Sequence, residues 1–445
     1  MSLPPADTLS NGASEDLPLE RLSSVITENA SIVSGYLATN HLPQPSFKAD
    51  GPSVIVPATA PPNVQVARQK LLSASLELLQ LATGPSDFLP NLATGFQYLS
   101  CLTWLCQYKI FHLVPLDASI SYDALSTASK VSAQRLKSVI RMSMTAGLFR
   151  EDVAGDSVVH SATSALLARD PVVYSYATHM CSGSAPVAQK MTAAAVKWGP
   201  DSTQSYETAF NVAFNTDLPF FDHLSRNPDK MADFSAYMRN VRSSDTVSLR
   251  HLTAGFAWDS IREAGIVVDV GGSTGDAAIA LADAFPHLKL VVQDLPANVD
   301  NGRKALDASP KASLAARITF QAHDFMEKQP VRDADVFLLR AVLHDWPDVQ
   351  AANIVRSLAD AMKGRPGSRL LIMDTMLPEP GSVPVSVERL VRVRDMTMLQ
   401  SFNSKERDLR DWKALLADAD AGLRLVNVVQ PFGSAMSVLE ATLDG

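Results

Sequence analysis

The segment HDWPD at residues 344–348 contains the side chain best suited to acid–base chemistry, His344. A neutral imidazole with a pKa of about 6.5 can accept a proton from a reacting hydroxyl at neutral pH. Such a base works best when an acceptor holds its second ring nitrogen, and Asp374 and Glu406 are the carboxylates that we expect in this role. For either carboxylate alone, a solvated surface charge is an equally good interpretation. Asp348, which follows a proline, is expected to cap the next helix.

A glycine-rich turn, GGSTG at residues 271–275, separates an apolar strand from a helix. Glycine lets the backbone approach a ligand closely and adopt positive φ angles. This turn alone would also suit a dinucleotide-dependent dehydrogenase, which is the alternative. Asp276 at the start of the helix argues against that alternative, because a carboxylate there would repel a pyrophosphate. With Asp269 on the preceding strand, it favours a cationic ligand without phosphate, such as S-adenosylmethionine (SAM).

Two further carboxylates lie where such a ligand needs acceptors. Asp294 ends the next apolar strand, where it can accept hydrogen bonds from ribose hydroxyls. Asp324 ends the third strand, where it can accept one from the adenine amino group while Phe325 packs on the ring. Each aspartate alone is more often a surface or capping residue. The carboxyl ends of consecutive parallel strands share one edge of a sheet, however, and this convergence favours a binding site.

Alternating strands and helices after Ala264 must position these groups. Five apolar strands and a final two-stranded hairpin are expected over residues 266–272, 289–296, 318–325, 335–343, 369–378 and 423–443. Apolar strands without strict alternation are typical of a parallel sheet that helices cover on both faces. We therefore expect an α/β fold with a mostly parallel, seven-stranded sheet.

The chain before this sheet is expected to be mainly helical. Helices are predicted near residues 19–40, 66–81 and 92–108, with an extended, proline-rich linker at 42–63. Residues 120–151 predict two short helices joined by a turn, and 148–161 predict a hairpin, which together make a winged-helix arrangement. We divide the chain into an N-terminal helix and linker, a winged-helix-like domain, a helical connector lining an apolar substrate cavity and a catalytic domain, at 1–64, 65–170, 171–262 and 263–445.

The charge pattern favours dimerisation over DNA binding for the winged-helix-like region. The second short helix offers only three basic side chains, and the hairpin tip carries three acidic ones: Arg135, Lys137, Arg141, Glu151, Asp152 and Asp156. The whole chain has 39 Lys+Arg against 47 Asp+Glu, a formal net charge of −8. This balance disfavours nonspecific binding to nucleic acid and to anionic membranes.

Cysteine usage and hydropathy indicate a cytoplasmic protein. The three cysteines are an odd number without a CxxC motif, so neither a disulfide framework nor a cysteine zinc site is expected. The first residues lack the basic start and apolar core of a signal peptide. No run of about 20 apolar residues suggests a membrane span. No HExxH-like pattern is present, and we expect no metal.

Five motifs in order, VVDVGGSTG, DLP, HDF, FLLRAVLHDWPD and MDTMLPEP, resemble those of the fungal relatives of the caffeic-acid-type plant O-methyltransferases. The resemblance covers about residues 66–440. It implies a Rossmann-like catalytic domain after a winged-helix dimerisation domain, in a homodimer whose N-terminal parts help to wall the substrate site. It also implies a proton acceptor and a set of SAM contacts, which are His344 and Gly271, Gly272, Asp294, Asp324, Phe325 and Arg340.

This chain departs from the plant pattern at two site positions. Arg340 stands where plant members have a lysine, which keeps the charge. Asp374 stands where they have a glutamate, which shortens the side chain by one methylene. Whether Asp374 or Glu406 orients His344 therefore stays open.

Three functions compete. The first is an O-methyltransferase acting on a phenolic or enolic hydroxyl of an aromatic, polyketide-like secondary metabolite. The second is a methyltransferase-like pericyclase that binds SAM without consuming it, and His344 within an intact HDWPD favours methyl transfer over this alternative. The third is a non-catalytic DNA-binding regulator, which the net charge disfavours.

Overall fold

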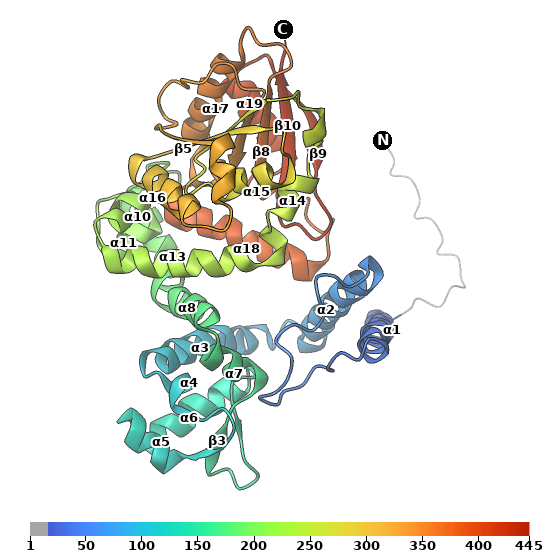
Figure 1. The fold of residues 1–445 in the computed structure, drawn as a ribbon. Helices are drawn as coiled ribbons and strands as arrows, with labels where there is room; N and C mark the ends of the chain where they lie inside the picture. The colour runs from blue at the N-terminus through green and yellow to red at the C-terminus, as the bar shows by residue number, and fades with distance from the viewer. Residues whose placement is uncertain (1–16, 445) are drawn as a thin grey trace, which may run out of the picture.

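Residues 17–444 are described by the computed structural model, in which an α/β half is joined to a helical half (Figure 1). The strands of the α/β half form one seven-stranded sheet in the order β6-β5-β4-β7-β8-β10-β9. The bounds are β4 Ile266–Val270, β5 Lys289–Asp294, β6 Ile318–Ala322, β7 Val336–Arg340, β8 Arg369–Asp374, β9 Leu423–Val429 and β10 Ser437–Leu443. The first five strands are mutually parallel, and β10 runs antiparallel to β8 and β9. The expected α/β architecture is confirmed.

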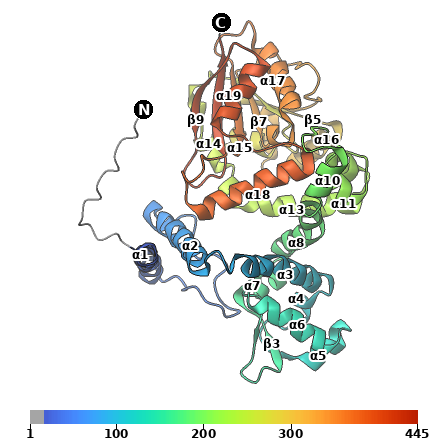
Figure 2. The same ribbon diagram turned by 180° about the vertical axis from the view of Figure 1, so that it is seen from behind.

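Helices cover both faces of the sheet, as the apolar strands predict. On β4, Val267 packs in one buried cluster and its neighbour Val268 in the other, because successive side chains point to opposite faces. The Val267 face packs against α15 (Asp276–Ala284) and α16 (Pro296–Asp307), which are seen in Figure 1. The Val268 face packs against α17 (Asp348–Met362) and α19 (Leu409–Ala419), which are seen from behind in Figure 2.

The three predicted N-terminal helices are present as α1 (Pro18–Thr39), α2 (Pro62–Thr83) and α3 (Phe88–Gln107). The proline-rich segment between α1 and α2 contains neither helix nor strand. Helices α1 and α2 pack together as a hairpin. Helix α2 also reaches α18 (Val385–Phe402) in the α/β half, where the Ser73 and Ser386 hydroxyls are hydrogen-bonded at 2.7 Å.

The predicted pair of short helices and the hairpin are also present. Helices α5 (Tyr122–Ser129) and α6 (Ala133–Met144) pack together, and β2 (Arg150–Glu151) pairs with β3 (Ser157–Val159). A third strand that was not predicted, β1 (Ile120–Ser121), pairs with the other side of β3. Helices α4 (Ile110–Leu113) and α7 (Ala162–Arg169) complete this region.

The connector is helical, as expected, and lies between the two halves of the molecule (Figures 1 and 2). Its helices are α8 Pro171–His179, a π-helical turn Met180–Ser184, α9 Ala185–Ala188, α10 Met191–Trp198, α11 Ala209–Phe214, α12 Phe220–Ser225, α13 Pro228–Ser243 and α14 Arg250–Ala254. Phe220 of α12 packs against Phe402 of α18, with ring centroids 5.0 Å apart. The connector and the α/β half therefore share an aromatic cluster.

Short 3-10 turns complete the described chain, at Asp245–Val247, Trp258–Ser260, Ala312–Arg317 and Leu343–Asp345. The last of these contains His344 and follows β7 directly. Within residues 17–444, none of the helices is both long and apolar enough to span a bilayer.

Candidate active site

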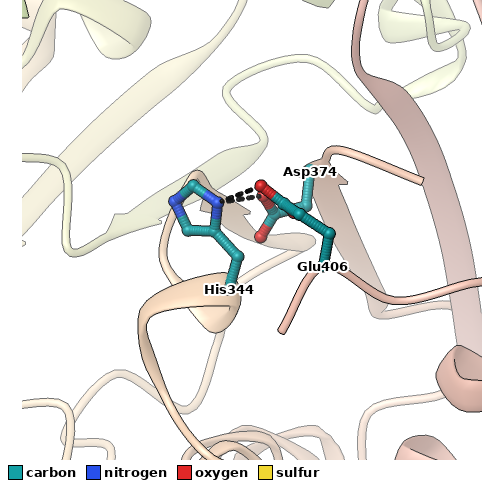
Figure 3. Close-up of side chains that lie close together, drawn as sticks. All are labelled: His344, Asp374 and Glu406. Carbon is teal, nitrogen blue, oxygen red and sulfur yellow. Dashed lines mark hydrogen bonds and ion pairs between the residues drawn. The ribbon is translucent and has the colours of Figure 1, made fainter. Parts of the chain in front are cut away.

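His344 lies just beyond the carboxyl end of β7, and two carboxylates hold one side of its ring. Its Nδ1 is 3.1 Å from Glu406 Oε1 and 3.4 Å from Asp374 Oδ1. Figure 3 shows both carboxylates on the Nδ1 side of the ring, while Nε2 points away from them. The side chain of His344 is 20% exposed, whereas those of Asp374 and Glu406 are 0% and 1% exposed. The two expected partners therefore contact His344 together.

The electrostatics of this cluster favour a charged imidazole. Burial by itself would lower the pKa of His344, but the negative charges of Asp374, Asp345 and Glu406 outweigh burial and hold that pKa well above its usual value. Asp345, which sequence reasoning did not single out, lies on the other side of the ring, with Oδ1 3.7 Å from Nε2. Burial raises the pKa of Asp374 to about 6, against the opposing effect of His344. The site is thus built to stabilise a proton on the imidazole.

A buried arginine that the sequence did not reveal fixes the HDWPD segment. Arg407 donates to the carbonyl oxygens of Leu343 and Trp346 at 2.7 and 2.9 Å, and its Nη2 is 2.8 Å from Asp348 Oδ1. Because Arg407 directly follows Glu406 in the chain, the same contacts fix the carboxylate that holds His344. The expectation that Asp348 caps the next helix is wrong: α17 has no side-chain cap, and Asp348 binds the guanidinium instead.

The glycine-rich turn after β4 lies at the same edge of the sheet. The amides of Gly271 and Gly272 both donate to the Gln293 carbonyl of β5, at 2.8 and 3.0 Å. Gly271 has a φ of +71°, which glycine adopts without strain. A Cβ on Gly272 would lie 2.6 Å from Asp269 Oδ2, so no side chain fits there without a shift. The glycines therefore keep this turn open for a ligand.

Asp294 closes the turn from the end of β5. Its carboxylate accepts from the amide of Ser273 at 2.7 Å, the amide of Leu295 at 2.8 Å and the side-chain amide of Asn298 at 2.7 Å. A carboxylate has about four acceptor positions. One position is therefore left for a ribose hydroxyl, and Asn298, which sequence reasoning missed, lies beside it.

Asp324 and Phe325 lie beyond the end of β6, on the far side of the turn. Asp324 is exposed, and its Oδ1 accepts from the amide of Met326 at 2.9 Å. Phe325 lies over the turn, because a Cβ on Gly271 would be 3.4 Å from its Cε1. The edge of Phe325 also packs on Trp346 of the HDWPD segment, with centroids 5.8 Å apart and planes at 85°.

Arg340 ends β7, between the glycine-rich turn and His344. Its Nη2 donates to the Val247 carbonyl at 2.6 Å, and its Nε is buried without a partner among residues 17–444. Asp269 Oδ2 is also buried without a partner in the same part of the chain. Burial raises the pKa of Asp269 to about 7, against the positive charge of Arg340. A polar ligand can satisfy these groups at this edge.

The structure brings every expected site residue to one edge of the sheet. The members come from the ends of β4, β5, β6, β7 and β8 and from the loop after α18, and they are Gly271, Gly272, Asp294, Asp324, Phe325, Arg340, His344, Asp374 and Glu406. This set fits SAM, since it combines an open glycine turn, acceptors for a ribose hydroxyl and an amino group, and an unsatisfied buried carboxylate beside a cation.

Comparisons with known proteins support the same assignment. Residues 190–423 match the family model of the O-methyltransferase domain. The chain is similar to the O-methyltransferase pgmB of Aspergillus terreus, with 61% identity over 426 residues and 96% of each chain covered.

Two solved structures share the fold. OxaC in complex with SAH (S-adenosylhomocysteine) and oxaline has a TM-score of 0.71 at 22% identity, over 95% of this chain and 100% of that one. A structure described as a pericyclic reaction enzyme has a TM-score of 0.68 at 24% identity, over 85% of this chain and 95% of that one. At these identities the two structures bear on the fold alone.

Three observations point to the same family. They are the sequence motifs, the sheet edge with its glycine, carboxylate and imidazole groups, and a relative of 61% identity. This chain belongs to the fungal class of the plant-like O-methyltransferase family and is a SAM-dependent O-methyltransferase.

Proposed function

We propose that this enzyme methylates a phenolic or enolic hydroxyl of an aromatic, polyketide-like secondary metabolite, with His344 as the general base. The observation that carries the proposal is the orientation of the imidazole. Two buried carboxylates hold Nδ1, and Nε2 faces away from them (Figure 3).

The order of the strands sets the proposed orientation of the cofactor. Asp324 on β6 would hold the adenine and Asp294 on β5 the ribose, with Phe325 against the ring. The glycine turn after β4 and Arg340 on β7 would then hold the methionine end, since the strand order is β6-β5-β4-β7. The order of the strands reverses between β4 and β7, and the carboxyl ends of strands at such a point are the usual ligand site of these sheets. His344 follows β7 and so lies beside the methionine end.

His344 performs the proton transfer in this proposal. When bound, SAM supplies a methyl group made electrophilic by the sulfonium. Nε2 of neutral His344 accepts the hydroxyl proton as the oxygen attacks, and Asp374 and Glu406 stabilise the imidazolium that forms. Holding the oxygen in line with the methyl group supplies much of the remaining rate enhancement.

The helical regions support two further parts of the proposal. We propose that the connector, residues 171–262, walls the substrate cavity through aromatic side chains such as Phe220, which packs on α18.

We also propose that the winged-helix-like region serves a homodimer and not DNA. In support, Arg141 pairs with Glu151 at 2.7 Å and Lys137 with Asp156 at 3.6 Å, which neutralises the basic face.

Exposed apolar side chains support the homodimer. Phe88, Leu89, Leu92 and Phe96 of α3 are each 58% to 71% exposed. Three of them, spaced by four residues, share one face of the helix. A second copy of this chain would remove this face from water.

A cytoplasmic location stays our expectation, and it agrees with three cysteines that are buried and free.

Product analysis tests the reaction. The purified chain is incubated with SAM and a panel of hydroxylated naphthalenes and anthraquinones, and SAH and products are quantified by mass spectrometry. We expect one SAH per methylated product, and none from analogues whose hydroxyls are already methylated. A panel member that is dehydrated or cyclised without SAH would favour the pericyclase alternative and contradict the proposal.

A further inference from the structure

Arg242, in the last turn of α13, contacts the helix that follows the glycine-rich turn, and it has no role in the assignments above. Its Nη1 is 3.3 Å from Oδ2 of Asp276, the first residue of α15. The two side chains are 49% and 58% exposed. This ion pair joins the connector to the cofactor edge, although α13 precedes the sheet in sequence by more than one element.

Arg242 also lies near the buried Arg340. Burial lowers the pKa of Arg340, and the positive charge of Arg242 lowers it further, while Asp269 and Asp276 oppose this effect. Arg242 pairs with the first residue after the glycine-rich turn, and Arg340 ends the neighbouring strand β7. In the proposed orientation, the methionine end of SAM occupies this part of the edge.

The methionine end of SAM carries an α-carboxylate, and the cofactor edge is otherwise acidic. Asp269, Asp276 and Asp294 suit the sulfonium and the ammonium but repel this carboxylate. Arg340 already donates through Nη2 to the Val247 carbonyl. Arg242 uses only Nη1 within the described chain, so its Nη2 and Nε are available to an anion. The planar guanidinium can bind two carboxylates at once.

We propose that Arg242 binds the α-carboxylate of SAM, bridging it to Asp276, and so makes the connector helix α13 part of the cofactor site. The geometry that carries this inference is the Arg242–Asp276 pair at the start of α15, beside Arg340. The inference rests on the cofactor orientation in the proposed function.

Decarboxylated SAM, which keeps the sulfonium and the amine but lacks the carboxylate, provides the test. Affinities of SAM, SAH and decarboxylated SAM are measured by calorimetry for the unaltered chain, Arg242→Met, Arg242→Lys and the control Arg239→Met. Arg239 is an exposed arginine on the same helix. Binding alone is measured, so the result does not depend on methyl transfer.

We expect Arg242→Met to weaken SAM and SAH binding about tenfold, which is the scale of one charge-assisted hydrogen bond. Decarboxylated SAM should bind this variant as it binds the unaltered chain, Arg242→Lys should recover part of the loss, and Arg239→Met should change nothing. Equal losses for SAM and decarboxylated SAM would mean a general effect on the turn and would overturn the inference, as would unchanged SAM binding. If the unaltered chain bound no SAM, the proposed function would fail together with it.

Discussion

At the residue scale, the sequence predicts the residues of the candidate site but not all of their contacts. The types of His344, Asp374 and Glu406 indicate a base with a carboxylate partner, and the structure brings these three side chains together. The sequence left open which carboxylate holds His344, because Asp374 and Glu406 are separated in the chain by the whole of α18. Both do so. Arg407 was missed because an arginine in NSKER has no pattern that distinguishes it from a surface charge.

The charge on Glu406 should set the pH dependence of the reaction. Its negative charge helps to keep the pKa of His344 above the ordinary value, and His344 must be neutral to accept a proton. Activity should therefore rise with pH as His344 deprotonates. Glu406→Gln removes one negative charge, lowers the pKa of His344 and should move this acid limb of kcat/KM to lower pH, with a reduced plateau.

A pH–rate profile of the variant, with Glu388→Gln on the outer part of α18 as control, checks this expectation. The control should leave the acid limb in place, because Glu388 pairs with Arg392 and not with His344. If the acid limb of kcat/KM remained at the same pH in Glu406→Gln, or moved to higher pH, Glu406 would not act on His344 through its charge.

At the element scale, the apolar pattern predicted the sheet because each strand is buried on both faces. Local capping was predicted less well. Asp348 is the first residue of α17 and not its N-cap, and its carboxylate accepts from the buried guanidinium of Arg407. The two-residue strand β1 was not predicted, since a pair of residues is too short to show a period. Such contacts depend on tertiary structure and not on local preference.

Arg407→Lys tests whether this one side chain positions the HDWPD turn. A lysine keeps the charge but cannot reproduce the planar set of donors to Leu343, Trp346 and Asp348. Because buried carbonyl groups would lose their partners, we expect the free energy of unfolding to fall by about 2 kcal/mol or more. Denaturant unfolding measures the change.

Arg410→Lys is the matched control, since Arg410 is exposed three residues further along the chain. The control should unfold like the unaltered chain. Equal stability of the Arg407 and Arg410 variants, together with unchanged kcat, would remove Arg407 from the account of the site.

At the scale of the whole molecule, the sequence predicts less about the helical half than about the sheet. Its helices were predicted from periodicity, but their contacts with the α/β half, such as Ser73 with Ser386, join residues more than 300 positions apart. The periodicity of a helix shows which face is apolar and does not show what covers it. The exposed apolar face of α3 is therefore where the homodimer proposal can be tested.

The double variant Leu92→Asp/Phe96→Asp should separate the proposed dimer. Both side chains are more than half exposed in the single chain, so the charges should not disturb its fold, whereas burying them against a partner would be costly. Size-exclusion chromatography with light scattering should give the mass of two chains for the unaltered protein and of one for the variant. Val153→Asp, at an exposed hairpin position, is the control and should remain dimeric. A double variant that also stays dimeric would exclude this face.

In the proposed mechanism, His344 accepts the substrate proton beside a cofactor edge that binds SAM independently of it. Single-turnover methyl transfer from labelled SAM, measured alongside SAM affinity in His344→Ala, tests this most directly. We predict that transfer falls about a hundredfold or more while SAM affinity is essentially unchanged. Undiminished transfer in His344→Ala would contradict the account.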